Sequence, residues 1–184
     1  MKLNRTMTEK QKKWRQVRSK VNRIIDGLGK KTDRKIREAI TALQVLGFNT
    51  NASCSGHLTH GVAAPWIDMG KDIPRSLIKR RNKKDRRALR ELKALKENNL
   101  SEQVRLMQIF DEFYRTRNVP NDVRLVLNQR GIYGNARLIN AGERIQDIRS
   151  REERREKLKR YRQEMDAFTD FLKKKYFMDN SVKH

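Results

Sequence analysis

The sequence has little cysteine and proline and no long hydrophobic run: its 184 residues include one cysteine and three prolines. A single cysteine cannot form a disulfide within the chain, which excludes a disulfide-stabilised scaffold. A membrane-spanning helix needs about 18 consecutive apolar residues, and no segment approaches that length. Residues 1–5 are not followed by an apolar stretch, so no secretory signal is expected. These absences predict a cytoplasmic protein with no membrane association.

Acidic residues are also scarce, since 22 of them face 45 lysines and arginines, for a formal net charge of +23. The excess gathers in three segments: residues 1–37 hold 14 basic and 3 acidic side chains, residues 71–100 hold 12 and 4, and residues 149–162 hold 8 and 3. Such a surface attracts polyanions and binds phosphates with strong salt dependence. The segments lack the aromatic- and leucine-rich opposite face of an interfacial helix. We therefore expect a nucleic-acid partner rather than a membrane surface.

Most of the chain has apolar residues at helical spacing. Helices are predicted over residues 8–28, 33–46, 75–97 and 101–117, with a break near Asn98 and Asn99 and with Ser101 as the N-cap of the fourth. A long helix is predicted over residues 143–178. Its distal half carries Leu158, Tyr161, Met165, Phe168 and Leu172 at alternating steps of three and four. That seam suits a partner helix from this chain or from a second copy, so self-association is one expectation.

Strands are predicted over residues 48–53 and 66–69, and residues 122–128 and 132–139 are predicted to form a β-hairpin. The expected fold is therefore α+β and mainly helical, with a small mixed sheet that includes a β-hairpin, and with a long C-terminal helix. The expected division is an α+β domain over residues 1–142 and a long C-terminal interaction helix over residues 143–184.

The segment from Gly47 to Gly70 differs from its surroundings, because its 24 residues contain no lysine or arginine. It holds Cys54, His57 and His60 in a Cys-x2-His-x2-His spacing, with Asp68 downstream. Thiolate, imidazole and carboxylate are all zinc ligands. Cys54, His57, His60 and Asp68 are thus a candidate zinc site, with water as a further ligand.

The same loop supports other interpretations. Ser53, Ser55 and Gly56 can form a nest of N–H groups and hydroxyls that binds an anion, with His57 as a proton donor or acceptor. His57, Cys54 and Ser55 are accordingly the candidate catalytic residues, with Cys54 as a conceivable nucleophile. In the simplest alternative, Cys54 packs as a small apolar residue and the loop is purely structural.

Two stretches carry a resemblance to known families. Residues 26–30, read Asp-Gly-Leu-Gly-Lys, and residues 47–56, which end in Ser-Cys-Ser-Gly, resemble the N-terminal part of the tRNA wybutosine-synthesising methyltransferase (type III) family. The loop also resembles uncharacterised bacterial proteins with a Ser-Cys-Glu-Gly-His motif followed by a segment like Pro65-Trp66-Ile67. The second group is the more similar at His57. The resemblance to the tRNA-modifying family implies an RNA-related function.

The basic residues that we expect to contact phosphates are Lys79, Arg80, Arg81, Lys83, Lys84, Arg86 and Arg87, together with Arg124 and Arg137 on the hairpin. Tyr133 in the hairpin turn is a candidate for base stacking, with ordinary packing as the alternative. The sequence favours RNA binding, with RNA modification at the loop of residues 53–60 as its enzymatic form. The alternative is a non-enzymatic DNA-binding or architectural protein. The two interpretations differ in whether the protein is an enzyme.

Overall fold

The computed structural model describes residues 7–25, 29, 31–59, 61–143 and 150–178. Its elements, in chain order, are α1 (Glu9–Asn22), η1 (Arg34–Ile36), α2 (Arg37–Val45), β1 (Thr50–Cys54), β2 (Trp66–Met69), α3 (Arg75–Asn82), α4 (Arg86–Tyr114), β3 (Leu125–Arg130), β4 (Asn135–Asn140) and α5 (Arg151–Met178). The expected α+β, mainly helical fold with a hairpin and a long C-terminal helix is confirmed. Among the described residues, no helix is both long and apolar enough to cross a membrane.

The four strands form one sheet in the order β1-β2-β4-β3. Every strand pairing is antiparallel. The mixed sheet that was expected from the sequence is therefore wrong. The hairpin β3–β4 supplies one edge strand, and the cysteine-bearing strand β1 supplies the other. In the register of β2 with β4, Asp68 lies opposite Arg137.

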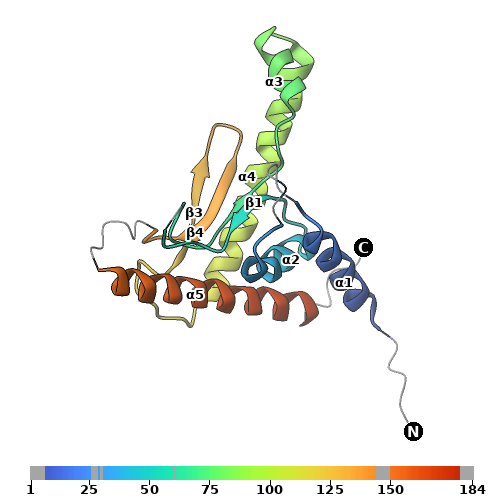
Figure 1. Cartoon of the computed structure of the whole chain (residues 1–184). Coiled ribbons are helices and arrows are strands. Elements are labelled where there is room, and N and C mark those ends of the chain that lie inside the picture. Colours follow the sequence, from blue (N-terminus) through green and yellow to red (C-terminus); the bar gives the residue numbers. More distant parts are fainter. Residues whose placement is uncertain (1–6, 26–28, 30, 60, 144–149, 179–184) are drawn as a thin grey trace.

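The main core lies between the sheet and the helices α1, α2, α4 and α5. Ile67 and Leu138, which are paired on adjacent strands, contribute to it from the sheet. The ring centroid of Phe168 on α5 lies 5.0 Å from that of Phe110 and 5.1 Å from that of Phe113, both on α4. The predicted seam of α5 is therefore filled from within this chain. Met165, Phe168 and Leu172 pack in the main core, whereas Leu158 and Tyr161 pack against loop and sheet residues. Helix α5 thus lies along the body instead of projecting from it (Figure 1).

Several helix boundaries differ from the sequence prediction: α5 begins at Arg151, the helix predicted over residues 75–97 is interrupted between Asn82 and Arg86, and Ser101, the predicted N-cap, lies inside α4. The first helix ends at Asn22 instead of residue 28, and Ile25 forms an isolated bridge with Lys31. The predicted break at Asn98 and Asn99 is wrong, because α4 runs through both residues. The chain breaks earlier, where Lys84 adopts a φ of 57° and the Asp85 carboxylate accepts the N–H groups that begin α4.

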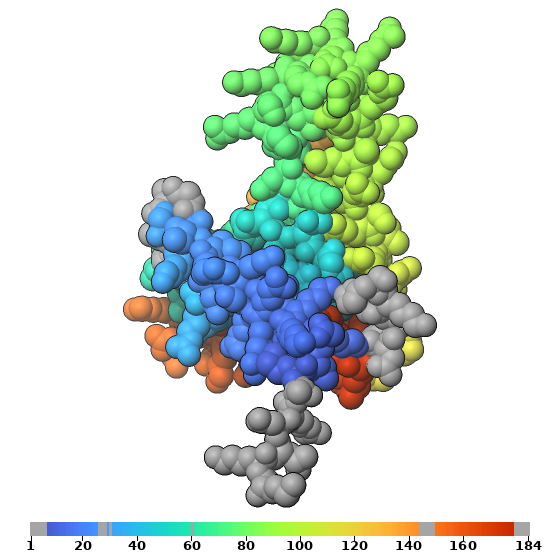
Figure 2. Space-filling view, turned by 90° about the vertical axis from the view of Figure 1, so that its right-hand side faces the viewer, coloured from blue at the N-terminus to red at the C-terminus, as the bar shows by residue number. Residues whose placement is uncertain are grey.

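Helix α3 and the beginning of α4 form a pair that projects from the body, and we call residues 75–97 the arm (Figures 1 and 2). A small apolar cluster of Leu77, Ala88 and Leu92 holds the two helices together. The hairpin turn supports the arm, because Tyr133 packs on this cluster and its hydroxyl accepts a hydrogen bond of 2.5 Å from Arg81 Nη1. The two helices and the hairpin thus brace one another.

Candidate functional site

The charge-free loop after β1 is tied to Asp33, which precedes η1. Ser55 donates both its backbone N–H (3.2 Å) and its hydroxyl (3.0 Å) to Oδ2 of Asp33. Nε2 of His57 lies 3.5 Å from the same oxygen. Burial opposes ionisation of Asp33, but the two Ser55 donors and the neighbouring His57 and Arg162 outweigh it and lower the pKa of this carboxyl. Asp33 is therefore a carboxylate at neutral pH.

Cys54 ends β1 beside this carboxylate. Its Sγ accepts a 3.3 Å hydrogen bond from the N–H of Gly56. Burial raises the pKa of the thiol, and the Asp33 charge adds to this, although the Gly56 N–H acts in the opposite direction. Without a bound cation, Cys54 is consequently a neutral thiol and a poor nucleophile at neutral pH.

Asp33, Cys54 and His57 each offer one ligand atom, and these three atoms lie within 4.8 Å of one another. All three residues are partly exposed and line a cavity of about 640 Å³. Ile24, Ile40 and Trp66 contribute apolar walls to the same cavity. A cation held by the three side chains would thus face a space large enough for a small ligand.

The loop conformation is held from the other side by Arg162 on α5. Its Nε donates to the carbonyl of Ser55 (3.0 Å) and its Nη2 to that of Gly56 (2.6 Å). Gly56 has a φ of 79°, and a Cβ at this position would lie 2.7 Å from the backbone carbon of Ala64. Glycine is required there both by the backbone conformation and by the close approach of Ala64.

The expected zinc ligands are only partly brought together. Cys54 and His57 lie in the cluster, whereas Asp68 forms a two-point ion pair with Arg137 at 2.6 and 2.8 Å. His60 lies outside the described residues. Asp33 takes the place expected for Asp68. The spacing of residues did not identify it, because it lies far from Cys54 along the chain, at the start of the helix predicted over residues 33–46. In the structure Asp33 occupies the N-cap position of η1, but its side chain makes no capping bond.

The donors of the predicted anion nest are largely occupied. The N–H and hydroxyl of Ser55 donate to Asp33, and the N–H of Gly56 donates to Cys54. The protein's own carboxylate thus sits where an external anion was expected. The cluster consequently suits a cation better than a phosphate.

The basic residues proposed for phosphate contact divide into two groups. In the first group the side chain makes interactions within the protein: Arg80 pairs with Asp85 and Glu91, Arg87 pairs with Glu91, Arg81 contacts Tyr133, Arg124 lies over Tyr114, and Arg137 contacts Asp68 and the ring of Trp66. The second group consists of Lys79, Lys83, Lys84 and Arg86, which are exposed and make no ion pair with any described residue. Tyr133 is committed to packing and to Arg81, which leaves the base-stacking prediction without support.

The exposed group is concentrated at the end of the arm. Lys79 lies on α3, Lys83 and Lys84 in the turn, and Arg86 at the start of α4. Figure 2 shows long side chains extending from this part of the molecule in several directions. Four cations on one short, braced projection form a surface that can contact phosphates without disrupting any ion pair described above.

Comparison of the chain with protein-family profiles, curated proteins and solved structures finds no match to any of them. The candidate function therefore depends on the arm and on the cluster at Asp33.

Proposed function

We propose that this protein binds nucleic acid through its arm, with structured RNA as the preferred partner. The observation that carries the proposal is the group of four exposed cations, Lys79, Lys83, Lys84 and Arg86, which have no ion-pair partner among the described residues. Cations near phosphates release condensed counterions, and this release supplies most of the affinity of sequence-independent binding. An exposed cation without a carboxylate partner makes that contact at no loss of an internal pair.

The support of the arm adds to this argument. Flexible lysine-rich tails incur an ordering cost when they bind, whereas α3 and α4 are held by their own apolar cluster and by the hairpin turn. The cations are therefore presented on a preformed surface. The preference for RNA over DNA rests on the similarity of residues 47–56 to the tRNA-modifying family.

The test is a salt titration of binding to an RNA hairpin and to a DNA duplex of the same sequence. We expect a quadruple variant, Lys79→Gln, Lys83→Gln, Lys84→Gln and Arg86→Gln, to bind weakly and to lose about 0.7–0.9 from the salt slope for each phosphate contact removed. A matched control changes four exposed cations elsewhere to glutamine, namely Arg15, Lys20, Arg115 and Lys174. The control has the same net charge, so it separates the arm from total charge.

Two results would contradict the proposal. Equal weakening by the arm variant and the control would show that binding follows net charge alone. Preference for the DNA duplex would favour the alternative, a DNA-binding or architectural protein. In that alternative the loop around Cys54 is structural, and no activity depends on it.

As a second candidate function, we propose that Asp33, Cys54 and His57 bind a zinc ion and that the arm brings RNA to it for modification. The observation favouring it is the 4.8 Å grouping of three suitable ligand atoms at an open cavity. Catalytic zinc commonly has three protein ligands and a water molecule, whose pKa the ion lowers. Ser55 would then orient the Asp33 carboxylate, as hydrogen-bonding partners of metal ligands commonly do.

Native mass spectrometry of protein purified without chelator tests this candidate. We expect one zinc per chain, lost in Asp33→Asn and Cys54→Ser but retained in Asp68→Asn, because Asp68 is committed to Arg137. Metal retained in Asp33→Asn and lost in Asp68→Asn would contradict the assignment. A metal-free wild type that takes up no added zinc would make the cluster structural.

A further inference from the structure

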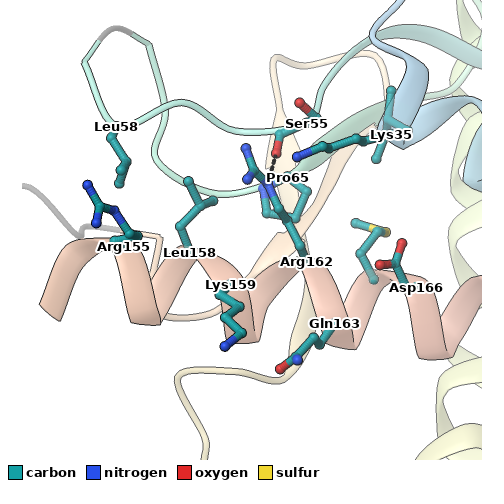
Figure 3. A pocket seen from close by; sticks show the side chains of 12 residues that line it. Lys35, Ser55, Leu58, Pro65, Arg155, Leu158, Lys159, Arg162, Gln163 and Asp166 are labelled. Carbon is teal, nitrogen blue, oxygen red and sulfur yellow. Dashed lines mark hydrogen bonds between the residues drawn. The ribbon is translucent and has the colours of Figure 1, made fainter. Parts of the chain in front are cut away.

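A second cavity lies next to the loop, between η1, the segment from Ser55 to Pro65, and α5. Its volume is about 490 Å³, which lies within the range of small-molecule sites. Figure 3 shows Arg155, Leu158 and Arg162 of α5 pointing toward the loop, while Lys35 enters from the side of η1. Neither the arm nor the cluster at Asp33 accounts for this cavity.

The polar lining of the cavity is mainly cationic. Lys35, Arg155, Lys159 and Arg162 line it, against one carboxylate, Asp166. The Nζ of Lys159 lies 3.8 Å from Oε2 of Glu156. Lys35 and Arg155 make no ion pair within the described part of the chain. This leaves more positive charge than Asp166 can balance.

Arg162 and Lys35 form the centre of this positive charge. Two donors of Arg162 hold the loop carbonyls, but no acceptor for its Nη1 is found among the described residues. In Figure 3 the Lys35 ammonium and the Arg162 guanidinium point toward one another below Ser55. The carboxylate of Asp166 lies near both cations and that of Asp33 near Arg162. Together with Arg155, the cations still outnumber these carboxylates, and phosphate is an anion that arginine and lysine commonly bind.

The rest of the lining is apolar and lies beside these cations. Leu58 and Pro65 come from the loop, and Leu158 comes from α5. The amide of Gln163 and the carboxylate of Asp166 also line the cavity and offer hydrogen-bonding groups. A purely apolar anion would leave these polar groups unused, and inorganic phosphate would leave the apolar wall exposed. A flat, polar-edged ring attached to a phosphate uses both.

We propose that this cavity binds a nucleoside monophosphate, with the phosphate between Lys35 and Arg162 and the base on Leu158, Pro65 and Leu58, toward the end of the cavity where Arg155 lies (Figure 3). The ligand is either a free nucleotide or the phosphorylated end of an RNA strand, which share the same chemistry. Because Arg162 also holds Ser55 and Gly56, occupancy of the cavity stabilises the loop that carries Cys54 and His57. This site is independent of the arm.

Isothermal titration calorimetry of the full chain at fixed salt tests the proposal with AMP, UMP, the two nucleosides and inorganic phosphate. We expect at least one monophosphate to bind about tenfold more tightly than its nucleoside and than inorganic phosphate. Lys35→Glu should weaken nucleotide binding about tenfold or more. The control Lys174→Glu, an exposed lysine on the same helix and outside the cavity, should bind normally.

A second variant tests the apolar wall. Leu58→Asn should reduce the preference for nucleotide over inorganic phosphate while leaving phosphate binding itself unchanged. Circular dichroism of each variant confirms that it is folded, and Leu58→Gln replaces Leu58→Asn if that variant is not. The proposal is overturned if no monophosphate binds more tightly than inorganic phosphate, or if Lys174→Glu weakens binding as much as Lys35→Glu.

The two sources of the ligand are separated in the arm variant, which removes the other expected RNA contact. A short 5′-phosphorylated RNA that binds more tightly than the monophosphate identifies a strand end, and equal or weaker binding identifies a free nucleotide. Both results support the site. Failure of nucleotides to bind would leave the arm proposal intact, because the two tests change different residues.

Discussion

At the scale of single residues, the loop around Cys54 is organised by one carboxylate. Oδ2 of Asp33 accepts two hydrogen bonds from Ser55 and faces His57. The same loop is held from its other side through two carbonyls by Arg162. The carboxylate of Asp33 on one side and the guanidinium of Arg162 on the other thus fix the positions of Cys54 and His57. This arrangement depends on the sharp turn at Gly56.

We expect Gly56→Ala to lower the free energy of unfolding by roughly 2–4 kcal/mol, because a Cβ at a positive φ would overlap a packed backbone. The overlap is specific, since the nearest atoms would be the Ala64 carbon at 2.7 Å and Leu158 Cδ1 at 2.9 Å. Gly61→Ala is the matched control, because Gly61 also has a positive φ but a Cβ there would meet nothing within 4 Å. Urea unfolding should show a loss of only about 1 kcal/mol for the control. Equal losses would mean that packing at Gly56 contributes nothing.

At the scale of elements, the arm is joined to the sheet through one buried amide in α4. Asn99 Oδ1 accepts from the N–H of Lys71 (2.8 Å), and its Nδ2 donates to the carbonyl of Tyr133 (3.0 Å). Gln103 adds a bond to the carbonyl of Gly134 at 2.6 Å. These contacts explain why asparagine, which favours caps and turns by local hydrogen bonding, lies here inside a continuous helix. Its amide is satisfied by other elements and does not compete with the helix backbone.

Asn99→Ala should therefore cost about 2–3 kcal/mol of stability, since it leaves a backbone N–H and a carbonyl without their partners. Amide hydrogen exchange should show the largest loss of protection in the hairpin turn and at Lys71. Asn98→Ala, at the exposed neighbouring position, should be neutral or slightly stabilising because alanine favours a helix. Similar effects from both substitutions would refute the role assigned to Asn99.

The start of α4 should respond to acid through Asp85. The side-chain hydrogen bond from Arg80 and the backbone N–H groups of Ala88 and Arg87 lower the pKa of this carboxyl. A lowered pKa in the folded state means that the stabilisation is present above the ordinary aspartate pKa of about 3.9 and is lost as the pH falls through the lowered value. We expect Asp85→Asn, which keeps a capping oxygen without the charge, to lose less Tm on acidification than the wild type. Parallel Tm curves for the two proteins from about pH 6 to about pH 2 would contradict this expectation.

At the scale of the whole molecule, a net charge of +23 is carried on a body whose core depends on α5. Leu158 and Tyr161 of this helix belong to one apolar cluster, and Met165, Phe168 and Leu172 belong to the main core. Self-repulsion among the cations opposes compaction. The aromatic contacts of Phe168 and Phe171 on α5 with α4 contribute to the opposing stabilisation.

Phe168→Ala should lower the free energy of unfolding by about 3–5 kcal/mol, as expected for removing a fully buried aromatic ring. Light scattering should show the same oligomeric state as the wild type, because Phe168 contacts Phe110 and Phe113 of its own chain. Lys174→Ala on the same helix provides the exposed control for both measurements. A changed oligomeric state with unchanged stability would instead place the seam between two copies.

Local sequence patterns were sufficient to predict much of the fold and part of the candidate site. The helical stripes, the hairpin, the charge of the arm and the distinct character of residues 47–70 all follow from spacing and composition, because each depends on residues close together in sequence. The same reasoning found Cys54 and His57, which lie three positions apart.

Only the tertiary structure decided which distant residues complete these features. Asp33 replaced Asp68 in the cluster because the sheet register places Asp68 opposite Arg137, and the fold brings Ser55 to Asp33. Asn99 continues a helix because partners from Lys71 and Tyr133 reach it. Arg155 and Lys35 share a cavity only because α5 packs beside η1 and the loop. Each of these contacts joins segments far apart in sequence, and local periodicity carries no information about such pairings.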